Sequence, residues 1–478
     1  MPDHDLVISN ATIIDGTGKP RYQGDVAVND GRIAVIGSCD AASAERHLDA
    51  QGHVLAPGFI DAHTHDDRAV LSDPDMLSKV SQGVTTVVGG NCGISLAPLS
   101  GVEPTPPMNL LGGQEWYRFA SVAQYMDEVD RTRPAVNIAL LCGHTTLRAS
   151  VMPEFDRAAR SEEIEQMAKR LDLAMEQGCI GMSTGLAYPP AINAPTEEVI
   201  ALAQRSAAQG GLYVTHMRNE REGVLDSVRE TLRIGQEADL PVVISHHKCT
   251  GRANWGMSKQ SLALIAKARE TQTVNLDVYP YVASSTVLLA DWVPAAEKVL
   301  VTWSVPHPEM NGMDLADIRA QWQVDTDEAV ARLSPAGAIY FQMDDADLER
   351  ILTFDDAMIG SDGLPHDDVP HPRLWGTFPR VLGHYARERK LFELEEAVRR
   401  MTKVTAQVFG FADRGEIREG AIADLVLFDA DRVLDRAEFS SPKQISAGIE
   451  HVWVGGVESY ANGKVTGSRN GRTLRRAN

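Results

Sequence analysis

Apolar residues in the middle of this 478-residue chain occur in short runs, and helical patterns of apolar and polar positions lie between or after them. This alternation predicts an α/β architecture, because parallel strands need crossover helices. Eight runs are strand candidates, and eight parallel strands close a TIM (β/α)8 barrel. The candidate strands are residues 55–61, 84–88, 136–141, 179–182, 212–214, 241–244, 274–278 and 357–359, and the clearest helical segments are 161–177, 195–209, 225–238, 258–270 and 392–401.

Short β-rich runs mark both ends of the chain. They are residues 6–8, 11–14, 24–28 and 32–36 near the N-terminus and residues 423–428 and 451–456 near the C-terminus. Strands this few and short bury little core by themselves. We therefore predict one small β domain, formed by residues 1–56 together with 412–478, and a barrel domain of residues 57–411 between its two parts.

A long segment separates the last two candidate strands of the barrel. From Tyr279 to Ala357 the chain is far longer than an ordinary βα loop. Long segments at this end of a barrel strand usually form lids or pocket walls. We expect residues 282–345 to form such an insertion, after barrel strand seven.

Reactive side chains follow several of the candidate strands. In a barrel, the C-terminal ends of all strands face one mouth, where catalytic residues gather. His63 and His65 are two positions apart on an extended segment, so they point to the same side and can share a cation. The other strand-end residues of this kind are Cys92, His144, His216, His246, His247 and Asp362. A single histidine at a strand end is more often structural, but this repetition predicts a metal site.

Each of these residues also has a simpler interpretation. Cys92 could be a small buried apolar residue, the commonest state of a free cysteine. Asp362 precedes a glycine and could cap the following turn. We interpret His144 and His247 as structural or supporting residues and favour ligation by His246.

Nitrogen and thiolate ligands suit Zn²⁺ better than Mg²⁺ or Ca²⁺, which prefer oxygen. A catalytic zinc keeps three protein ligands and one open position for water. It lowers the pKa of that water towards ~7, and a nearby carboxylate can then move the proton to a leaving amine. Asp362 is the candidate for this carboxylate.

The composition and charge of the chain limit the kinds of partner that we expect it to bind. The chain has 66 acidic and 46 basic residues, a formal charge of −20, which disfavours nucleic acid and anionic membranes as partners. Its five scattered cysteines have no CxxC spacing, which favours a reducing compartment. No apolar run is long enough for a signal peptide or a membrane span. We expect a cytoplasmic protein, a monomer or small homo-oligomer, with a small-molecule substrate.

The whole pattern resembles the amidohydrolase superfamily, and more narrowly the D-aminoacylases (N-acyl-D-amino-acid deacylases), across essentially the entire chain. The most specific segment is 360–379, which contains Gly-Ser-Asp-Gly-Leu-Pro-His-Asp and then His-Pro-Arg-Leu-Trp-Gly-Thr-Phe-Pro. The other segments that carry the resemblance are 57–66, 83–96, 215–218, 244–248 and 277–281.

The resemblance implies a metal-dependent enzyme that cuts N-acyl-D-amino acids. It implies one tight zinc held by Cys92, His216 and His246, and a weaker second site at His63 and His65.

Strand four differs from that of many superfamily members, which carry a carboxylated lysine there. Residues 179–184 contain no lysine, and Cys92 looks like its replacement. This difference favours a one-metal mechanism, with Asp362 carried over as general base and acid.

The resemblance also implies how the substrate is held. Arg373 is the candidate for gripping the substrate carboxylate, assisted by Lys248 and Tyr279; the alternative for Arg373 is a surface salt bridge. The insertion would shape an apolar side-chain pocket. Its candidate residues, with those of the strand-four loop, are Ala187, Tyr188, Leu288, Leu289, Trp292, Pro294, Tyr340 and Met343.

These residues favour apolar D-amino acids as the released product. Three alternatives remain: an N-acyl-D-glutamate or N-acyl-D-aspartate deacylase, a cyclic amidase similar to hydantoinase or dihydroorotase, and a non-catalytic scaffold.

Overall fold

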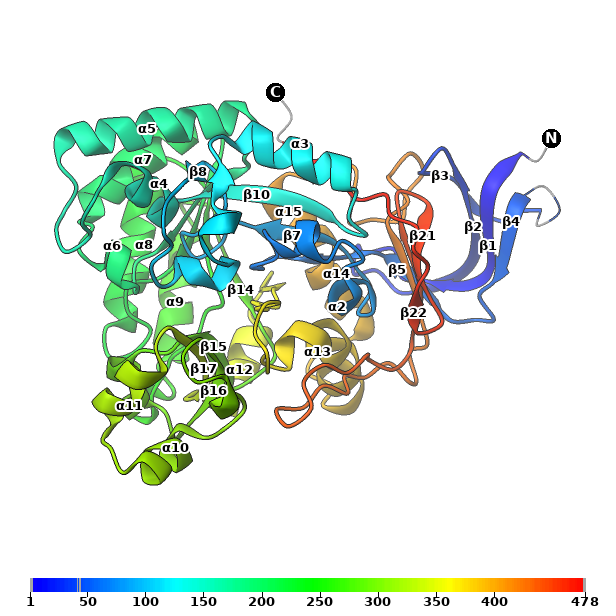
Figure 1. The fold of residues 1–478 in the computed structure, drawn as a ribbon. Helices are drawn as coiled ribbons and strands as arrows, with labels where there is room; N and C mark the ends of the chain where they lie inside the picture. The colour runs from blue at the N-terminus through cyan, green and yellow to red at the C-terminus, as the bar shows by residue number, and fades with distance from the viewer. Residues whose placement is uncertain (1–2, 41, 43, 476–478) are drawn as a thin grey trace.

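The computed structural model describes residues 3–40, 42 and 44–475 and contains the predicted barrel (Figure 1). Eight parallel strands follow one another in the order β18-β14-β13-β12-β11-β10-β7-β6. The first and last of these close the ring, since Ala62 N donates to Ile359 O at 3.2 Å and Thr64 bridges Gly363. The barrel strands are β6 (Phe59–Asp61), β7 (Val84–Gly89), β10 (Asn137–Gly143), β11 (Gly181–Gly185), β12 (Leu212–His216), β13 (Val242–Ile244), β14 (Val274–Val278) and β18 (Met358–Ile359).

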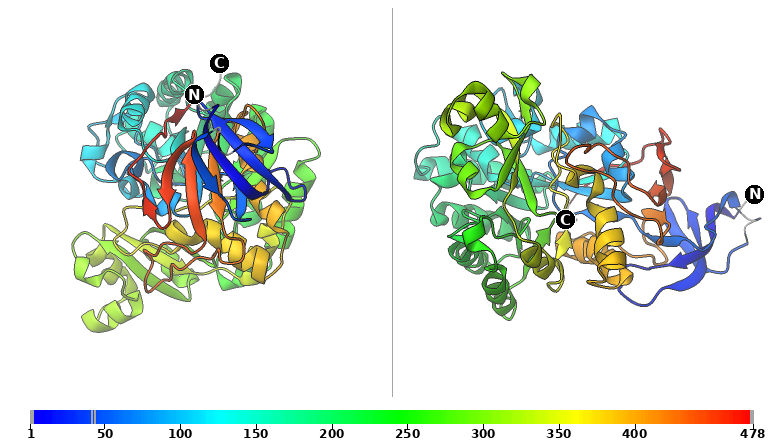
Figure 2. Two further views of the ribbon diagram at one scale, coloured as in Figure 1. Left: turned by 90° about the vertical axis from the view of Figure 1, so that its right-hand side faces the viewer. Right: turned by 90° about the horizontal axis from the view of Figure 1, so that it is seen from below.

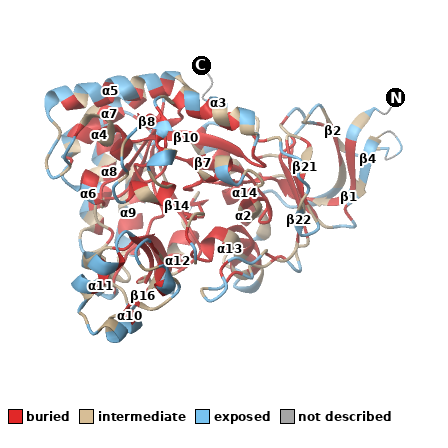
Figure 3. Cartoon of the chain, viewed as in Figure 1, coloured by how far each residue is buried: buried red, intermediate tan, exposed pale blue. Residues whose placement is uncertain are grey.

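Helices return the chain between these strands and cover the outside of the barrel (Figure 1). In α8, for example, Val224, Val228 and Ile234 are buried against the strands, a helical spacing of apolar positions. Figure 3 shows the same division, with buried strands inside and exposed positions along the outer faces of the helices. The helices are α1 (Ala69–Ser72), α2 (Leu77–Val80), α3 (Val122–Thr132), α4 (His144–Val151), α5 (Ser161–Glu176), α6 (Pro189–Ile192), α7 (Thr196–Ala208), α8 (Val224–Ala238), α9 (Ser258–Ala268), α12 (Asp345–Leu352), α13 (Arg373–Arg380), α14 (Leu394–Met401) and α15 (Lys403–Phe409). Within the described residues, no helix combines the length and apolarity needed to cross a membrane.

The predicted first strand, residues 55–61, is two strands that belong to different sheets. β5 (Val54–Pro57) pairs with strands of the β domain, whereas β6 pairs with β7 in the barrel. Gly58 is the joint between them. A Cβ atom at this position would lie 2.2 Å from the side chain of Thr85, so the close passage of the two segments requires glycine. Both halves are apolar, and the pattern alone therefore predicted one strand.

The termini combine in a second sheet, as predicted. Its strands follow the order β22-β21-β20-β19-β5-β1-β2-β3, with β4 paired to β1. In Figure 2, the N-terminal strands and the C-terminal strands lie side by side in this sheet. The runs 6–8 and 11–14 form one strand with an irregularity between Ile8 and Ala11. The strands are β1 (His4–Ile13), β2 (Tyr22–Asn29), β3 (Arg32–Gly37), β4 (Ala44–Asp49), β19 (Leu425–Phe428), β20 (Ile449–Val454), β21 (Val457–Ala461) and β22 (Lys464–Val465).

The end of the chain returns to the barrel. β23 (Thr473–Leu474) pairs in parallel with β10, and Thr473 N donates to Asp130 Oδ1 at 2.7 Å. The last described residues of the segment 412–478 therefore pack on the barrel domain.

The long insertion after β14 forms a layer of its own at the lower left of Figure 1. Its three strands are antiparallel in the order β15-β17-β16. Leu315, Ile318, Val330 and Leu333 pack on this sheet and give the insertion a separate core. The elements are β15 (Ala283–Val287), β16 (Lys298–Ser304), α10 (Leu315–Trp322), α11 (Thr326–Leu333) and β17 (Ala336–Phe341).

A fully buried lysine links the two strands that close the barrel. Lys79 Nζ lies 2.8 Å from Asp61 Oδ2 and 3.1 Å from Asp66 Oδ2, and it donates to Ser361 Oγ at 2.9 Å. Asp61 Oδ1 in turn accepts a hydrogen bond from Ser361 N at 2.7 Å. The end of the first strand and the segment after the last strand are therefore tied to one cation.

Replacing Lys79 should weaken the fold strongly. Lys79→Met leaves two buried carboxylates without their cation, and we expect the free energy of unfolding to fall by about 3–5 kcal/mol. Denaturant and thermal unfolding followed by circular dichroism measure this change. The matched control is Lys169→Met, because Lys169 pairs with Glu165 at 3.4 Å while both side chains are exposed (70% and 66%). Equal stability of the two variants would contradict the role assigned to Lys79.

Candidate metal centre and active site

Cys92 lies at the centre of a cluster of histidines in the barrel mouth. It follows the end of β7, and its Sγ lies 3.4 Å from His63 Nε2, 3.4 Å from His246 Nε2 and 3.7 Å from His216 Nδ1. These histidines follow or end three other strands, so the barrel brings them together from distant parts of the sequence. All four side chains are buried.

The cluster offers three overlapping sets of metal ligands whose donor atoms lie within 4.8 Å of one another. The sets are Cys92, His216 and His246; His63, His65 and Cys92; and His63, His246 and Asp362. Sulfur and imidazole nitrogen in a closely spaced, buried group suit Zn²⁺, so these residues fit the metal that the sequence predicts. Cys92, His63 and His246 each belong to two of these sets, so the sets would share ligands if more than one ion were bound.

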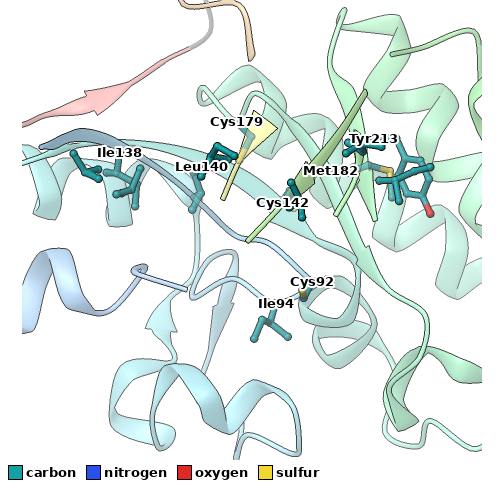
Figure 4. Close-up of a cluster of buried hydrophobic side chains, with 14 of the residues drawn as sticks. Cys92, Ile94, Ile138, Leu140, Cys142, Cys179, Met182 and Tyr213 are labelled. Atoms are coloured by element: carbon teal, nitrogen blue, oxygen red, sulfur yellow. The ribbon is translucent and has the colours of Figure 1, made fainter. Parts of the chain in front are cut away.

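The surroundings of Cys92 distinguish it from the structural cysteines. Burial raises the pKa of its thiol, but the charges of His63 and His246 outweigh burial and hold that pKa well below 9.0. Cys142 and Cys179, by contrast, lie among apolar residues such as Leu140 and Met182 (Figure 4). There, burial alone raises the pKa of the Cys142 thiol to about 12. Cys92 is therefore poised as a thiolate ligand, unlike an inert core cysteine.

Two buried carboxylates that the sequence analysis missed orient the histidines. Asp277, on β14, places Oδ2 3.5 Å from His63 Nδ1 and accepts a hydrogen bond from His246 N at 2.9 Å. Glu220 places one oxygen 3.2 Å from His246 Nδ1 and the other 3.7 Å from His216 Nε2. Carboxylates behind ligating histidines fix the ring orientation and the tautomer. The sequence signal that could have identified Glu220 is its position four residues after His216, a candidate ligand.

Asp362 reaches the same cluster from the segment after β18. Its Oδ1 lies 3.3 Å from His65 Nε2 and 3.6 Å from His63 Nε2, and its Oδ2 lies 2.9 Å from Arg373 Nη1. Burial raises the pKa of the Asp362 carboxyl, but Arg373 and His246 hold it well below its usual range. The carboxylate is therefore ionised and faces the candidate ligands, so it can accept a proton there.

Lys248 and Arg373, the two cationic side chains predicted to bind the substrate carboxylate, both lie close to the ring of Tyr279. Lys248 Nζ donates to Glu220 Oε1 at 2.8 Å and lies 5.7 Å from the ring of Tyr279. Arg373 Cζ lies 4.5 Å from the same ring, and Nη2 donates to Ser285 O at 2.8 Å. The side chain of Arg373 is completely buried, so the alternative of a surface salt bridge is wrong.

His144 and His247 point away from the cluster. His144 Nε2 contacts Glu198 Oε1 at 2.9 Å, and His247 Nε2 contacts Ser261 Oγ at 2.8 Å. Both residues have structural partners, as the sequence analysis predicted.

A narrow cavity of about 20 Å³ lies over the cluster, bounded by both the barrel and the insertion. Lys248 and Asp362 lie on its barrel side, and Ser285, Trp292 and Gln342 on its insertion side. The insertion therefore forms a wall of the site.

The predicted pocket residues divide into several groups. Tyr188 and Trp292 line the cavity, and the centroid of the Tyr188 ring lies 4.9 Å from that of His216 and 5.7 Å from that of Trp292. Leu289 faces a groove further out. Met343 lies beside Tyr279, in a neighbouring cavity.

The remaining predicted pocket residues lie behind this surface. Tyr340 is completely buried, and its hydroxyl accepts a hydrogen bond from Leu289 N and donates to Val287 O. It supports Trp292 from behind, with the two ring centroids 6.1 Å apart. Leu288 belongs to the core of the insertion, and Pro294 is exposed.

Comparison with known proteins agrees with this geometry. The sequence profile of the amidohydrolase family matches residues 46–302 and 328–460. The chain belongs to this family. It is 51% identical over 472 residues to a D-aminoacylase of Alcaligenes xylosoxydans xylosoxydans, covering 99% of this chain and 98% of that protein. It is 47% identical over 475 residues to an N-acyl-D-glutamate deacylase of the same organism, covering 99% and 96%.

Solved structures of amidohydrolases show the same architecture. A D-aminoacylase structure, solved to define the role of a binuclear metal centre, superposes with a TM-score of 0.97 at 50% identity, covering 99% of this chain and 100% of that one. The N-acyl-D-glutamate deacylase of Bordetella bronchiseptica, in complex with zinc and a phosphonate mimic of the tetrahedral intermediate, superposes with a TM-score of 0.95 at 46% identity and the same coverage. The predicted fold class is confirmed.

Removing the shared thiol should empty the metal centre. We expect Cys92→Ala to be purified with far less bound metal than the wild type, because Cys92 belongs to two of the three ligand sets. Elemental analysis by inductively coupled plasma mass spectrometry gives the metal content per chain. Cys142→Ala, which changes a buried cysteine of the apolar core, is the control and should keep its metal. Full metal retention by Cys92→Ala, with normal circular dichroism, would contradict a ligand role.

Proposed function

We propose that this chain is a zinc-dependent deacylase that hydrolyses N-acyl-D-amino acids to a carboxylate and a free D-amino acid. The observation that carries the proposal is the convergence of the Cys92 thiol, four histidines and an ionised Asp362 in the barrel mouth. The relationship to D-aminoacylases over nearly the full length of the chain supports the choice of substrate.

Cys92, His216 and His246 would hold the tight zinc, and His63 and His65 would form a weaker second site that shares Cys92. When bound, zinc supplies Lewis acidity, which lowers the pKa of a water molecule and polarises the substrate carbonyl. Asp277 and Glu220 keep the histidine rings in place for this purpose.

Asp362 would move the proton. Arg373 and the neighbouring histidines keep its carboxylate ionised, so it can take a proton from the attacking water. The same carboxyl, now protonated, can then donate to the nitrogen of the leaving D-amino acid. Its positions 3.3 Å from His65 and 3.6 Å from His63 place it beside the candidate ligands, where this transfer is needed.

Lys248 would bind the carboxylate of the substrate. It lines the cavity over the cluster, whereas Arg373 lies behind Asp362. Tyr279 lies against both cations and would complete the carboxylate site. Arg373 would then have two functions, since it neutralises Asp362 and strengthens the positive potential at this end of the cavity.

Apolar D-side chains are favoured because Leu110, Tyr188, Trp292 and Leu364 line the cavity. One observation favours an acidic side chain as a second candidate. The guanidinium of Arg221 lies 5.3 Å from the ring of Trp292 and borders the adjacent cavity, where it could meet a D-glutamate or D-aspartate carboxylate. A cyclic amidase has less support, because the sequence of β11, Gly-Met-Ser-Thr-Gly, provides no lysine.

The state of the cysteines bears on the location of the enzyme. All five cysteines are free, which agrees with a reducing compartment, and we propose a cytoplasmic monomer or small homo-oligomer.

The substrate class can be tested by amine release from paired N-acetyl-D- and N-acetyl-L-amino acids. The panel is methionine, leucine, phenylalanine, glutamate and aspartate, with zinc-loaded protein. We expect turnover in the D series alone, with the highest kcat/KM for an apolar side chain. A preference for glutamate or aspartate would support the role of Arg221. Activity on hydantoins or dihydroorotate, without activity on the panel, would overturn the proposal.

The role of Asp362 predicts a separate loss of catalysis. We expect Asp362→Asn to keep zinc at Cys92, His216 and His246 but to lower kcat by a factor of about 10²–10⁴, because the amide cannot accept the proton. Steady-state kinetics together with metal analysis measure both effects. Asp368→Asn, in the same segment, is the control, since Asp368 is exposed and accepts a hydrogen bond from Asn311 at 2.8 Å. Near wild-type activity of Asp362→Asn would remove this residue from the mechanism.

A further inference from the structure

A groove of about 570 Å³ opens at the surface beside the barrel mouth. This volume is typical of small-molecule sites. The walls come from the loops after β7, β10 and β11 and from the insertion. Apolar side chains dominate the walls: Pro106, Phe155, Pro189, Ile192, Leu289 and Trp292. Ile192 is 49% exposed, an unusual state for a large apolar side chain in the described part of this protein.

The groove shares lining residues with the cavities at the candidate active site. Trp292 lines the groove, the narrow cavity over the metal ligands, and a cavity of about 220 Å³ next to both. Ala187 and Ile192 line the groove and this middle cavity, which also reaches His216. Ala187, Ile192 and Trp292 are the apolar residues of the middle cavity, and they also line the groove; the other residues around the middle cavity, such as Arg218 and Glu220, are polar or charged.

The two ends of a linear substrate should point in opposite directions from the cluster. Lys248 and Tyr279, which would hold the carboxylate, follow β13 and β14. Three walls of the groove follow β7, β10 and β11, and β10 lies opposite β14 in the ring of eight strands. With the scissile carbonyl at the cluster between them, the acyl group is directed towards the groove.

We propose that this groove binds the acyl chain of the substrate, and that the substrate class includes D-amino acids carrying long unbranched fatty acyl groups. The inference rests on the proposed function and specifies its substrate. Water adds its oxygen to the acyl carbon, the amide C–N bond breaks, and the protons leave on the free amine and the fatty acid. A neutral hydrocarbon chain suits the apolar walls.

The rim of the groove argues against an acidic occupant. Asp156 and Asp291 are exposed at its edge and would repel a second carboxylate on the substrate. An apolar D-side chain is the remaining competitor for the same surface. The experiment must therefore vary the acyl group and the side chain separately.

The first measurement is the dependence of kcat/KM on acyl length. Zinc-loaded enzyme is assayed on the acetyl, butanoyl, hexanoyl and octanoyl derivatives of D-methionine, below their critical micelle concentrations. Each buried methylene should raise kcat/KM about two- to fourfold, so the octanoyl substrate, with six more methylenes, should exceed the acetyl substrate by about 60-fold or more. A flat or falling series would overturn the inference but leave the deacylase function intact. Absence of turnover on every member would overturn both.

The second measurement places the chain in the groove. Ile192→Asp should lower the ratio of octanoyl to acetyl kcat/KM about tenfold, because a charge now faces the hydrocarbon. Leu173→Asp is the matched control: Leu173 is equally exposed (48%) but lies on α5, outside the groove, and its ratio should equal that of the wild type.

A third series, N-acetyl-D-alanine, D-methionine and D-phenylalanine, separates the two apolar occupants. We expect Ile192→Asp to affect these substrates alike. An effect that grows with side-chain size, while the octanoyl ratio is unchanged, would assign the groove to the amino acid and overturn the proposal.

Discussion

The structure depends on a buried ionic contact at the closure of the barrel. Lys79, Asp61 and Ser361 hold the end of β6 against the segment that follows β18. The same two segments carry His63 and Asp362, and Asp362 N donates directly to His63 O at 2.8 Å. Burying these charges is costly and is offset only by good geometry. The contacts that close the barrel therefore also align Asp362, the candidate proton carrier, with His63, a candidate ligand.

Three candidate site residues that follow barrel strands have a strained backbone conformation. Cys92, His246 and Asp362 have φ values of +51°, +36° and +49°, a region that residues other than glycine rarely adopt. Such conformations cost of order 1–3 kcal/mol each and persist only where the surrounding structure enforces them. At His246, the enforcing contact is the hydrogen bond from its N–H to Asp277. The strained backbone turns the sulfur, imidazole and carboxylate towards a common centre. The protein therefore loses some local stability, and its candidate ligands are already in position to bind.

Features of the fold and site that depend on a local sequence pattern could be predicted, whereas features that depend on contacts between distant segments could not. Strand ends identify Cys92, His216 and His246 among the candidate ligands, because a parallel barrel gathers those ends at one mouth. Their grouping as one ligand set is what the resemblance to D-aminoacylases implied. Asp277 could not be recognised in this way, since a carboxylate inside a strand has no local signature. The division of the first strand at Gly58 was hidden for a related reason: its requirement for glycine comes from Thr85. The pairing of Arg373 with Asp362 likewise exists only in the folded molecule.

The residues for the proposed chemistry and the residues for substrate selection lie in different parts of the fold. Every candidate metal ligand lies on a barrel strand or directly after one, whereas Trp292, the side chain shared by the site and the outer groove, belongs to an insertion with its own core. Tyr340 supports Trp292 from within that core. Substitutions in the insertion can therefore reshape the walls without disturbing the cluster around Cys92. Two relatives, each 47% identical to this chain, carry the names of different D-amino acids, aspartate and glutamate. Such a division of the fold would allow the walls to change while the hydrolytic centre is kept.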